Sequence, residues 1–184
     1  MRNQKVSDLM VPLSDYATVS MNDTLGQAIH ELKLAQTDPR FRHKHRAVLA
    51  YDDDKHIVGK LGVWEILKAL EPKYMQFEHP DSTNNFGLSR FGFSPDFLNS
   101  LVDRFSLWSE SMDELVEKAS SQRVKDLMYT PSNDEFIAHD ALVATAVHQF
   151  IIGCHQSLLV QNDKAVVGIL RLVDIVDLIC NIAD

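Results

Sequence analysis

The sequence predicts an α+β fold built from two β-α-β-β-α repeats that pack around a pseudo-twofold axis, with a helical insertion between them. Two observations predict it. A five-residue segment near the start of the chain recurs about two thirds of the way along, and the residues after both copies stay in register. Both copies also show the same order of apolar segments, helix starts and turns, which is the pattern of a duplicated unit.

The repeat is visible residue by residue. Residues 6–10 (VSDLM) recur as residues 124–128 (VKDLM), an offset of 118, which also carries residues 28–30 (AIH) onto residues 146–148 (AVH). The offset then falls to 110, and to 109 after the turn at residues 52–54. The first copy therefore has eight extra residues between its helix and the next strand, and one extra residue in a turn.

Each copy contains the same elements in the same order. An extended segment leads to a predicted helix cap, Asn22 or Asp140, because Asn and Asp side chains accept the free amide hydrogens of a first helical turn. Apolar residues at helical spacing follow each cap. Two short apolar strands around an Asp/Asn-rich turn come next, and a closing helix ends the copy. The predicted strands span residues 47–51, 56–61, 157–161 and 165–170.

Residues 71–122 belong to neither copy, so the predicted domains are residues 1–70, 71–122 and 123–184. Ser94-Pro95-Asp96 predicts a helix start, and residues 111–114 (SMDE) fit a capping box. An apolar stripe follows the first start: Phe97, Leu98, Leu101, Val102, Phe105 and Trp108. It has two interpretations, a face that packs on the core of a repeat or a surface for a dimer or another partner.

Composition limits the function. The chain has 18 basic and 26 acidic residues and a net charge of −8, which argues against binding to nucleic acid or to an anionic membrane. Cys154 and Cys180 show no paired spacing and predict reduced, buried thiols. No apolar stretch reaches the ~18 residues of a spanning helix, and the N-terminus lacks the apolar run of a signal peptide. We expect a cytoplasmic protein.

Catalytic and metal-binding motifs are absent from the sequence. It has no GxSxG, P-loop, HExxH, paired CxxC or GxGxxG pattern. Its eight histidines are scattered, and the acidic run at residues 52–54 lacks the Gly and terminal Glu of a calcium loop. We therefore expect no enzymatic activity and no metal ion.

The duplicated pattern resembles the cystathionine-β-synthase (CBS) domain. The resemblance rests on the VxDLM segment followed by an extended segment with an Asn or Asp. It also rests on an apolar hairpin whose second strand contains a Val-Gly pair. An acidic residue then follows in the closing helix. It covers about residues 5–70 and 123–182. It implies a regulatory tandem pair, a Bateman module, which binds an adenosine-containing ligand (AMP, ADP, ATP or S-adenosylmethionine) in the clefts between repeats. It also implies a homodimer that reports to an enzyme or transporter.

The resemblance implies site residues at matching positions. In that family an Asp of the closing motif holds the ribose hydroxyls and a Thr or Ser contacts phosphate. Asp174 stands at the Asp position and Arg171 at the Thr/Ser position, where Arg could bind phosphate with two hydrogen bonds. In the first copy Glu65 and Gly62 occupy these positions, so the second cleft fits a nucleotide better.

Residues that precede the central strands complete the predicted ligand set. Lys44, His45 and Arg46 end the basic cluster of residues 39–46 and could meet a polyphosphate, with a solvated loop as the alternative. His155 and Ser157 stand at the corresponding edge of the second cleft, and Thr18 and Ile137 lie in the extended segments. The competing function is a nucleotide-independent scaffold or dimerisation protein that uses the middle insertion.

Overall fold

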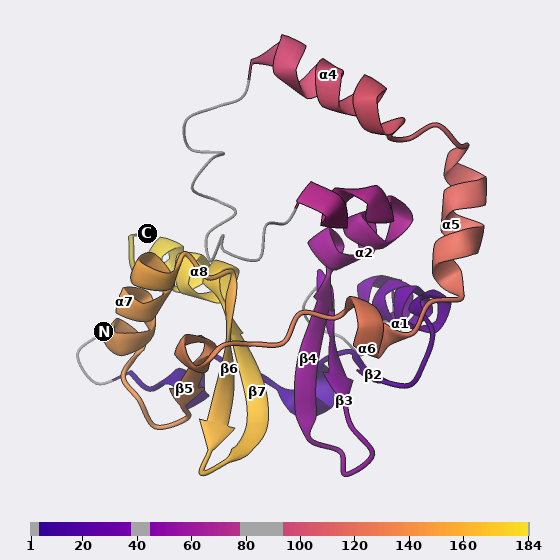
Figure 1. Cartoon of the computed structure of the whole chain (residues 1–184). Coiled ribbons are helices and arrows are strands. Elements are labelled where there is room, and N and C mark those ends of the chain that lie inside the picture. The colour runs from indigo at the N-terminus through magenta and orange to yellow at the C-terminus, as the bar shows by residue number, and fades with distance from the viewer. Residues whose placement is uncertain (1–3, 38–44, 78–93, 184) are drawn as a thin grey trace.

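The computed structural model describes residues 4–37, 45–77 and 94–183, so Lys44 lies outside the described residues. Both repeats have the predicted order of strand, helix, strand, strand and helix (Figure 1). The first repeat contains β2 (Thr18–Ser20), α1 (Leu25–Thr37), β3 (Ala47–Tyr51), β4 (Ile57–Gly62) and α2 (Val63–Leu70). The second contains β5 (Phe136–Ala138), α7 (Val143–Gly153), β6 (Ser157–Asn162), β7 (Ala165–Arg171) and α8 (Leu172–Ala183).

Each repeat has its own small sheet. In the first, β2 is parallel to β3 and β3 forms an antiparallel hairpin with β4. The second repeats this with β5, β6 and β7, and gains a fourth strand, β1 (Val11–Pro12), which pairs antiparallel with β7. Because β1 belongs in sequence to the first copy, the sheet of the second repeat is completed by residues from the first.

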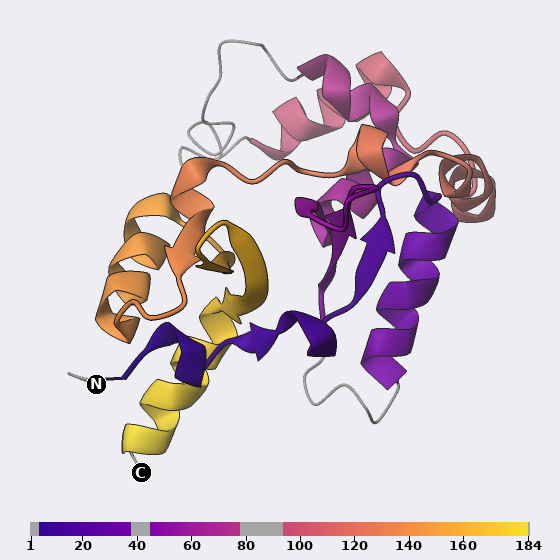
Figure 2. The ribbon, with the colours of Figure 1, turned by 90° about the horizontal axis from the view of Figure 1, so that it is seen from below.

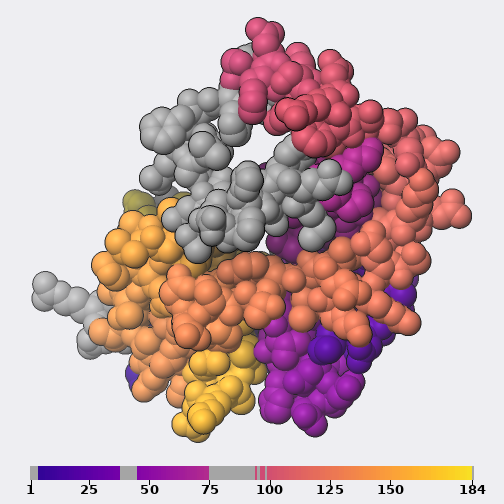
Figure 3. Space-filling model, viewed as in Figure 1, coloured from indigo at the N-terminus to yellow at the C-terminus, as the bar shows by residue number. Residues whose placement is uncertain are grey.

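The two copies exchange their VxDLM segments. The segment that contains η1 (Val6–Asp8) docks on the second repeat, where the amides of Val6 and Ser7 donate to the carbonyls of Ala141 and His139, both at 2.9 Å. The segment of α6 (Val124–Leu127) docks on the first repeat through an equivalent pair of bonds, also at 2.9 Å. Figure 2 shows the N-terminal segment crossing between the repeats, and Figure 3 shows the chain after α5 crossing on another face.

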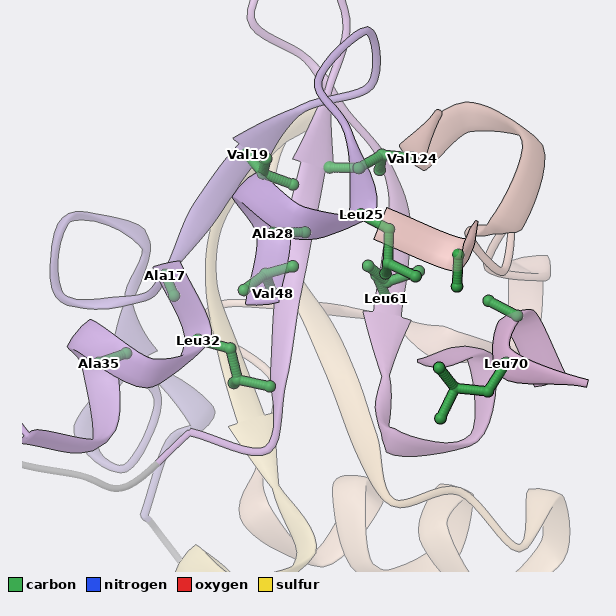
Figure 4. Packing of buried hydrophobic residues seen from close by; sticks show 13 residues of the cluster. Ala17, Val19, Leu25, Ala28, Leu32, Ala35, Val48, Leu61, Leu70 and Val124 are labelled. Atoms are coloured by element: carbon green, nitrogen blue, oxygen red, sulfur yellow. The ribbon is translucent and has the colours of Figure 1, made fainter. Parts of the chain in front are cut away.

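Three apolar clusters form the core. One lies between α1 and the first sheet and includes Val124 from the second copy (Figure 4). Its counterpart in the second repeat includes Val6 from the first copy. The third cluster lies at the seam between the two sheets and joins Leu49 and Leu159, both fully buried, with Val11, Tyr16 and Ile169. The sequence-based boundaries at residues 70 and 123 stay a prediction, and in space the copies share their cores.

The part of the insertion that the structure describes contains the two α-helices that its capping patterns predict. Ser94 Oγ accepts the Phe97 amide at 3.2 Å at the start of α4 (Pro95–Phe105). Ser111 and Glu114 cap α5 (Met112–Ser120) reciprocally. Short 3-10 turns lie at η2 (Leu13–Asp15), η3 (Pro72–Phe77) and η4 (Asn133–Glu135).

The two helices of the insertion are placed differently. Leu115 and Ala119 of α5 are buried against the first repeat, whereas α4 lies at the outer end of the molecule (Figures 1 and 3). Its Phe97 and Val102 are exposed. The apolar stripe thus remains partly at the surface.

The buried carboxylate of Glu71, directly after α2, binds the later part of the insertion. Glu71 Oε2 accepts the Trp108 amide at 2.7 Å, and Lys73 Nζ donates to the Ser106 carbonyl at 2.7 Å. The indole of Trp108 also donates to the Tyr74 hydroxyl at 3.1 Å. These contacts hold the chain that joins α4 to α5 against the end of α2.

Two expectations from the sequence are wrong. The cap of α1 is Thr24 rather than Asn22: Thr24 Oγ1 accepts the Gln27 amide, and residues 21–23 are used instead to dock the second VxDLM segment. The helix α7 begins after Leu142 without a side-chain cap, so Asp140 does not cap it either.

The thiols of Cys154 and Cys180 are free, but they are exposed rather than buried. Among the described residues, no helix combines the length and hydropathy needed to cross a membrane.

We predict that Val6→Ala and Val124→Ala each lower the free energy of unfolding by about 2 kcal/mol, because each removes buried methyl groups and leaves a cavity in the opposite repeat. Urea unfolding followed by circular dichroism measures this. Val116→Ala, at an exposed position on α5, is the matched control and should change the free energy by less than about 0.5 kcal/mol. Equal, small effects at all three positions would contradict the exchange.

Candidate ligand site between the repeats

An ion pair marks the end of the second sheet. Arg171 is the last residue of β7, and Asp174 lies in the first turn of α8. Asp174 Oδ2 accepts the Arg171 amide at 2.9 Å and Arg171 Nε at 3.0 Å, while Oδ1 accepts Arg171 Nη2. The side chains are only 12% and 7% exposed. The carboxylate is thus engaged at both oxygens, through a helix-capping bond and a two-pronged guanidinium contact.

Tyr16 brings the first repeat to this site. Burial raises the pKa of the Tyr16 hydroxyl to about 12; the positive charge of Arg171 lowers it and the negative charge of Asp174 raises it. The phenol is therefore neutral and keeps its proton to donate. Its ring stacks on the imidazole of His45, with centroids 4.1 Å apart, and His45 Nδ1 accepts the Ala17 amide at 3.1 Å. Both repeats therefore contribute to the surroundings of Asp174.

The other residues predicted for the second cleft lie in three environments. Ser157 begins β6 and pairs in register with Arg171, so it lies at the same end of the sheet. His155 Nε2 lies 3.1 Å from Asp134 Oδ2, which places its ring against η4. The Ile137 side chain is buried in the core of the second repeat. Their contact with a ligand stays a prediction.

The first repeat repeats the geometry with different chemistry. Glu65 Oε2 accepts the Gly62 amide at 2.9 Å, the counterpart of the bond between Asp174 and the Arg171 amide. Because Gly62 has no side chain, the position has no equivalent of the Arg171 guanidinium. Of the basic cluster, Arg46 is exposed and His45 is buried against Tyr16. His45 thus packs on the Tyr16 ring rather than extending into solvent.

A second buried charge cluster lies on the first-repeat side of the seam. Lys60 Nζ of β4 contacts Glu135 Oε2, and the Tyr129 hydroxyl donates to Glu135 Oε1 at 2.5 Å. The side chains of Lys60 and Glu135 are 13% and 5% exposed. In the alignment of the two sequence copies, Lys60 corresponds to Ile169, Tyr129 to Val11 and Glu135 to Ala17. At each of these three pairs, one copy has an apolar residue where the other has a charged or polar one.

Two further features lie away from this seam. An open groove of about 760 Å³ follows the β2 edge between α1 and the end of α5, and Thr18 lines it with Asp23, His30 and Glu31. At the β3–β4 turn, carboxylate and imidazole atoms of Asp52, Asp54 and His56 lie within 4.8 Å of one another. Asp52 Oδ1 accepts the amides of Asp54 and His56, so the turn itself accounts for this grouping and we assign no metal to it.

Sequence reasoning missed Tyr16, Lys60, Tyr129 and Glu135. The alignment of the two copies could have singled out Lys60, because a lysine at the position that Ile169 occupies in the second copy breaks an otherwise apolar pattern. Tyr16 carries no such signal. Its place beside Asp174 depends on β1 pairing with a strand of the other repeat, more than 150 residues along the chain.

Comparison with known proteins gives a family match for the first repeat. A family model, the CBS domain, matches residues 6–72. Residues 6–72 form a CBS domain. The whole chain has the fold of CBS-domain pair proteins. Among solved structures, the CBS-pair protein CBSX2 from Arabidopsis thaliana matches with a TM-score of 0.60 and 19% identity, over 98% of this chain and 97% of that one.

Other CBS-domain structures match in the same way. A crystal structure of CBSX2 in complex with AMP matches with a TM-score of 0.59 and 16% identity, over 98% of this chain and 99% of that one. A putative acetoin utilization protein, AcuB, from Vibrio cholerae matches with a TM-score of 0.59 and 17% identity, over 97% of this chain and 92% of that one. No curated protein matches the chain in sequence. At these identities the structures show the fold of a CBS pair, with both repeats and the seam between them.

We predict that the buried pair at the seam makes stability depend on pH. Burial alone would raise the pKa of Glu135, but hydrogen bonds from Lys60 and Tyr129 and the Lys60 charge hold it below its usual value. A carboxyl whose pKa is lowered by folding stabilises the protein above the unfolded value of about 4.3. This contribution is lost as the pH falls through the folded pKa.

Glu135→Gln should therefore lower the free energy of unfolding by about 3 kcal/mol at neutral pH, where it leaves the Lys60 charge buried without its partner. The difference from the unaltered protein should shrink below about pH 4. Urea unfolding across this pH range measures both. Glu117→Gln, at an exposed carboxylate on α5, controls for the loss of one negative charge. A pH-independent difference would contradict the coupling.

Proposed function

We propose that the chain is a regulatory ligand-sensing module that binds an adenosine-containing nucleotide (AMP, ADP, ATP or S-adenosylmethionine) in the cleft beside Asp174. One observation carries this proposal: a buried carboxylate in the first turn of α8, joined by an arginine of β7 and approached by Tyr16 from the other repeat. A carboxylate can accept hydrogen bonds from both hydroxyls of a ribose, and an arginine can bind phosphate with two.

The comparisons support the same function. The CBSX2 structure in complex with AMP covers nearly the whole of both chains, so an adenine nucleotide is a ligand of at least one protein with this fold. In this chain we assign Asp174 to the ribose and Arg171 to the phosphate. Ser157 and His155 are proposed to line the edge of the cleft.

The first cleft is proposed as a weaker or different site. Glu65 is one methylene longer than Asp174 and would hold a ribose at a shifted position. Arg46, directly before β3, is exposed and can attract a polyphosphate. Lys44 and His45 belong to the same segment. Thr18, which lines the groove along β2, is kept in this proposed set.

We propose a regulatory rather than a catalytic role, with an enzyme or transporter as the regulated partner. The residues beside Asp174 are engaged in a carboxylate–guanidinium pair and an aromatic stack, an arrangement suited to holding a ligand. The free thiols of Cys154 and Cys180, exposed at the surface, support a reducing compartment such as the cytoplasm.

A homodimer is proposed from the closing helices. Both α2 and α8 follow the last strand of a repeat and lie at the same end of the two sheets (Figure 1). Trp64 of α2 is 66% exposed, and Val176 and Ile179 of α8 are each 48% exposed. A second copy of the chain would bring the same pair of apolar helices, which is how a twofold interface covers one patch with itself.

We predict that an adenine nucleotide raises the melting temperature by about 5–10 °C at 100 times its dissociation constant, since a ligand that binds only the folded state stabilises it by mass action. Thermal-shift titration with AMP, ADP, ATP and S-adenosylmethionine, with and without magnesium, measures this. Asp174→Ala should abolish the shift, whereas Glu117→Ala, which removes an exposed carboxylate on α5, should keep it.

An unchanged shift in Asp174→Ala would refute the site. No shift with any nucleotide, in a sample that melts cooperatively, would favour the scaffold function. Attention would then turn to the exposed residues Phe97 and Val102 of α4.

We predict that Val176→Asp combined with Ile179→Asp converts a dimer to a monomer, because two charges would be buried in an apolar contact. Light scattering after size-exclusion chromatography measures the mass. Ile152→Asp, at a position on α7 that is 73% exposed, is the control and should leave the mass unchanged. A dimer that survives the α8 change and dissociates with the α7 change would move the interface to α7.

A further inference from the structure

Helix α5 covers one surface of the first repeat. Leu115 and Ala119 of α5 are only 7% and 1% exposed, and Ala119 packs in the buried cluster that contains Leu70 at the end of α2. Ser120 of α5 lies so close to Gly26, near the start of α1, that a Cβ added to Gly26 would be 3.4 Å from the Ser120 Cβ. The surface under α5 is called the α5 seat below, and it consists of Gly26, Ala69, Leu70 and Lys73.

The second repeat has the same surface without α5. In the alignment of the two copies, the corresponding residues are all apolar and are called the second seat: Ala144 of α7 and Leu178, Ile179 and Ile182 of α8. Ile179 is 48% exposed, whereas its counterpart Leu70 is 8% exposed. Ile182 is 59% exposed and Ala144 is exposed as well. Among the described residues, therefore, no helix covers the second seat as α5 covers the first.

The chain passes both seats in the same way. Gln122, just after α5, accepts the Leu25 amide at 2.8 Å at the start of α1. Gln4 stands at the corresponding position in the other copy and accepts the Val143 amide at 2.9 Å at the start of α7. The internal twofold thus extends to the edge of the seats, so the contacts of α5 show how a helix would lie on the second seat.

We propose that the second seat is a docking site for an amphipathic helix of the regulated partner, with a large apolar residue and a small one four residues apart, as Leu115 and Ala119 are in α5. An exposed apolar surface of this kind is where a partner helix gains its affinity. The inference rests on the proposed regulatory function and adds the kind of partner and its place. That place is the end of α8, the helix whose first turn contains Asp174.

A helix of a second copy fits this surface less well. The α5 helix of any copy is already buried on its own first repeat. The exposed helix α4 contains no Ala or Gly, while the second seat has Ala144 and Leu178 where the first has the smaller Gly26 and Ala69. A seat with larger side chains needs a small residue on the docking helix even more than the first seat does.

The first experiment supplies the helix in the same chain. Residues 111–121, which contain α5, are grafted directly before Gln4 in place of residues 1–3. The graft should raise the melting temperature by about 5 °C, because it buries apolar surface on both the helix and the second seat. A graft with Asp in place of its leucine should give no rise. Equal melting temperatures with and without the intact graft overturn the docking site.

The second experiment supplies the helix as a separate molecule, a peptide of residues 111–122 added to the unaltered chain. Heteronuclear NMR detects the weak binding expected of a peptide that is not helical when free. Amide shifts should change at the start of α7 and the end of α8. Ala144→Glu should abolish the changes, and Thr145→Glu should keep them, because its counterpart Gln27 stays exposed beside α5. Glu suits the first turn of a helix, so both variants should fold.

The remaining outcomes identify the occupant. No shift changes, or the same changes in Ala144→Glu, overturn the site, and changes confined to α1 and α2 do so too, because the peptide then only replaces α5. A mass that falls in Ala144→Glu by light scattering shows that a second copy occupies the seat, and overturns the partner assignment. Neither experiment uses a nucleotide. A nucleotide-induced thermal shift that persists when the graft and the peptide have no effect therefore overturns the docking site alone.

Discussion

The structure depends on the reciprocal exchange of the two VxDLM segments. Val6 and Val124 are fully buried, each in the core of the repeat to which it does not belong in sequence. Equivalent backbone bonds of 2.9 Å hold both segments, so the exchange follows the internal twofold. A single repeat of this size buries too little apolar surface to be stable alone. Neither repeat has a complete core without the other, which ties the seam to the folding of the whole chain.

The same exchange positions the candidate site. After Val6 docks on the second repeat, the chain pairs with β7 through β1 and reaches Tyr16 before it enters its own sheet. Tyr16 is therefore held beside Arg171 and Asp174 by the segment that completes the core. Among the described residues, this end of the proposed site is built from a strand end and the first turn of a helix, elements that hold side chains more precisely than loops do.

The two copies have diverged most where they meet. The seam contains an apolar cluster with Ile169 and Val11, whereas the residues that correspond to these two in the other copy, Lys60 and Tyr129, both contact Glu135. A buried ion pair seldom adds net stability over apolar packing, but it fixes one relative placement of its partners strongly. The Lys60–Glu135 contact therefore joins β4 of the first repeat to η4, at the start of the second repeat, across the seam.

Much of this could be predicted from the duplicated sequence, and the rest could not for a physical reason. The offset aligned Asp174 with Glu65 and Arg171 with Gly62, and the strands and closing helices lie where the turn and apolar patterns predict. Correspondence between copies does not say which core a segment enters. The exchange, Tyr16 and the Lys60–Glu135 contact all depend on long-range pairing. The wrong prediction of Asn22 as a helix cap has the same origin, because the turn at residues 21–23 binds the VxDLM segment of the other copy.

The placement of Asp174 also bears on how a bound nucleotide could be reported. This residue lies in the first turn of α8, and the exposed apolar residues Val176 and Ile179 follow within the next two turns. A ligand that draws Arg171 away from Asp174 changes the contacts at the start of the helix that carries the proposed dimer surface. Because one rigid element bears both, a shift of α8 against its sheet is sufficient to link the cleft to the surface, and the first repeat offers α2 for the same purpose only if Glu65 finds a ligand.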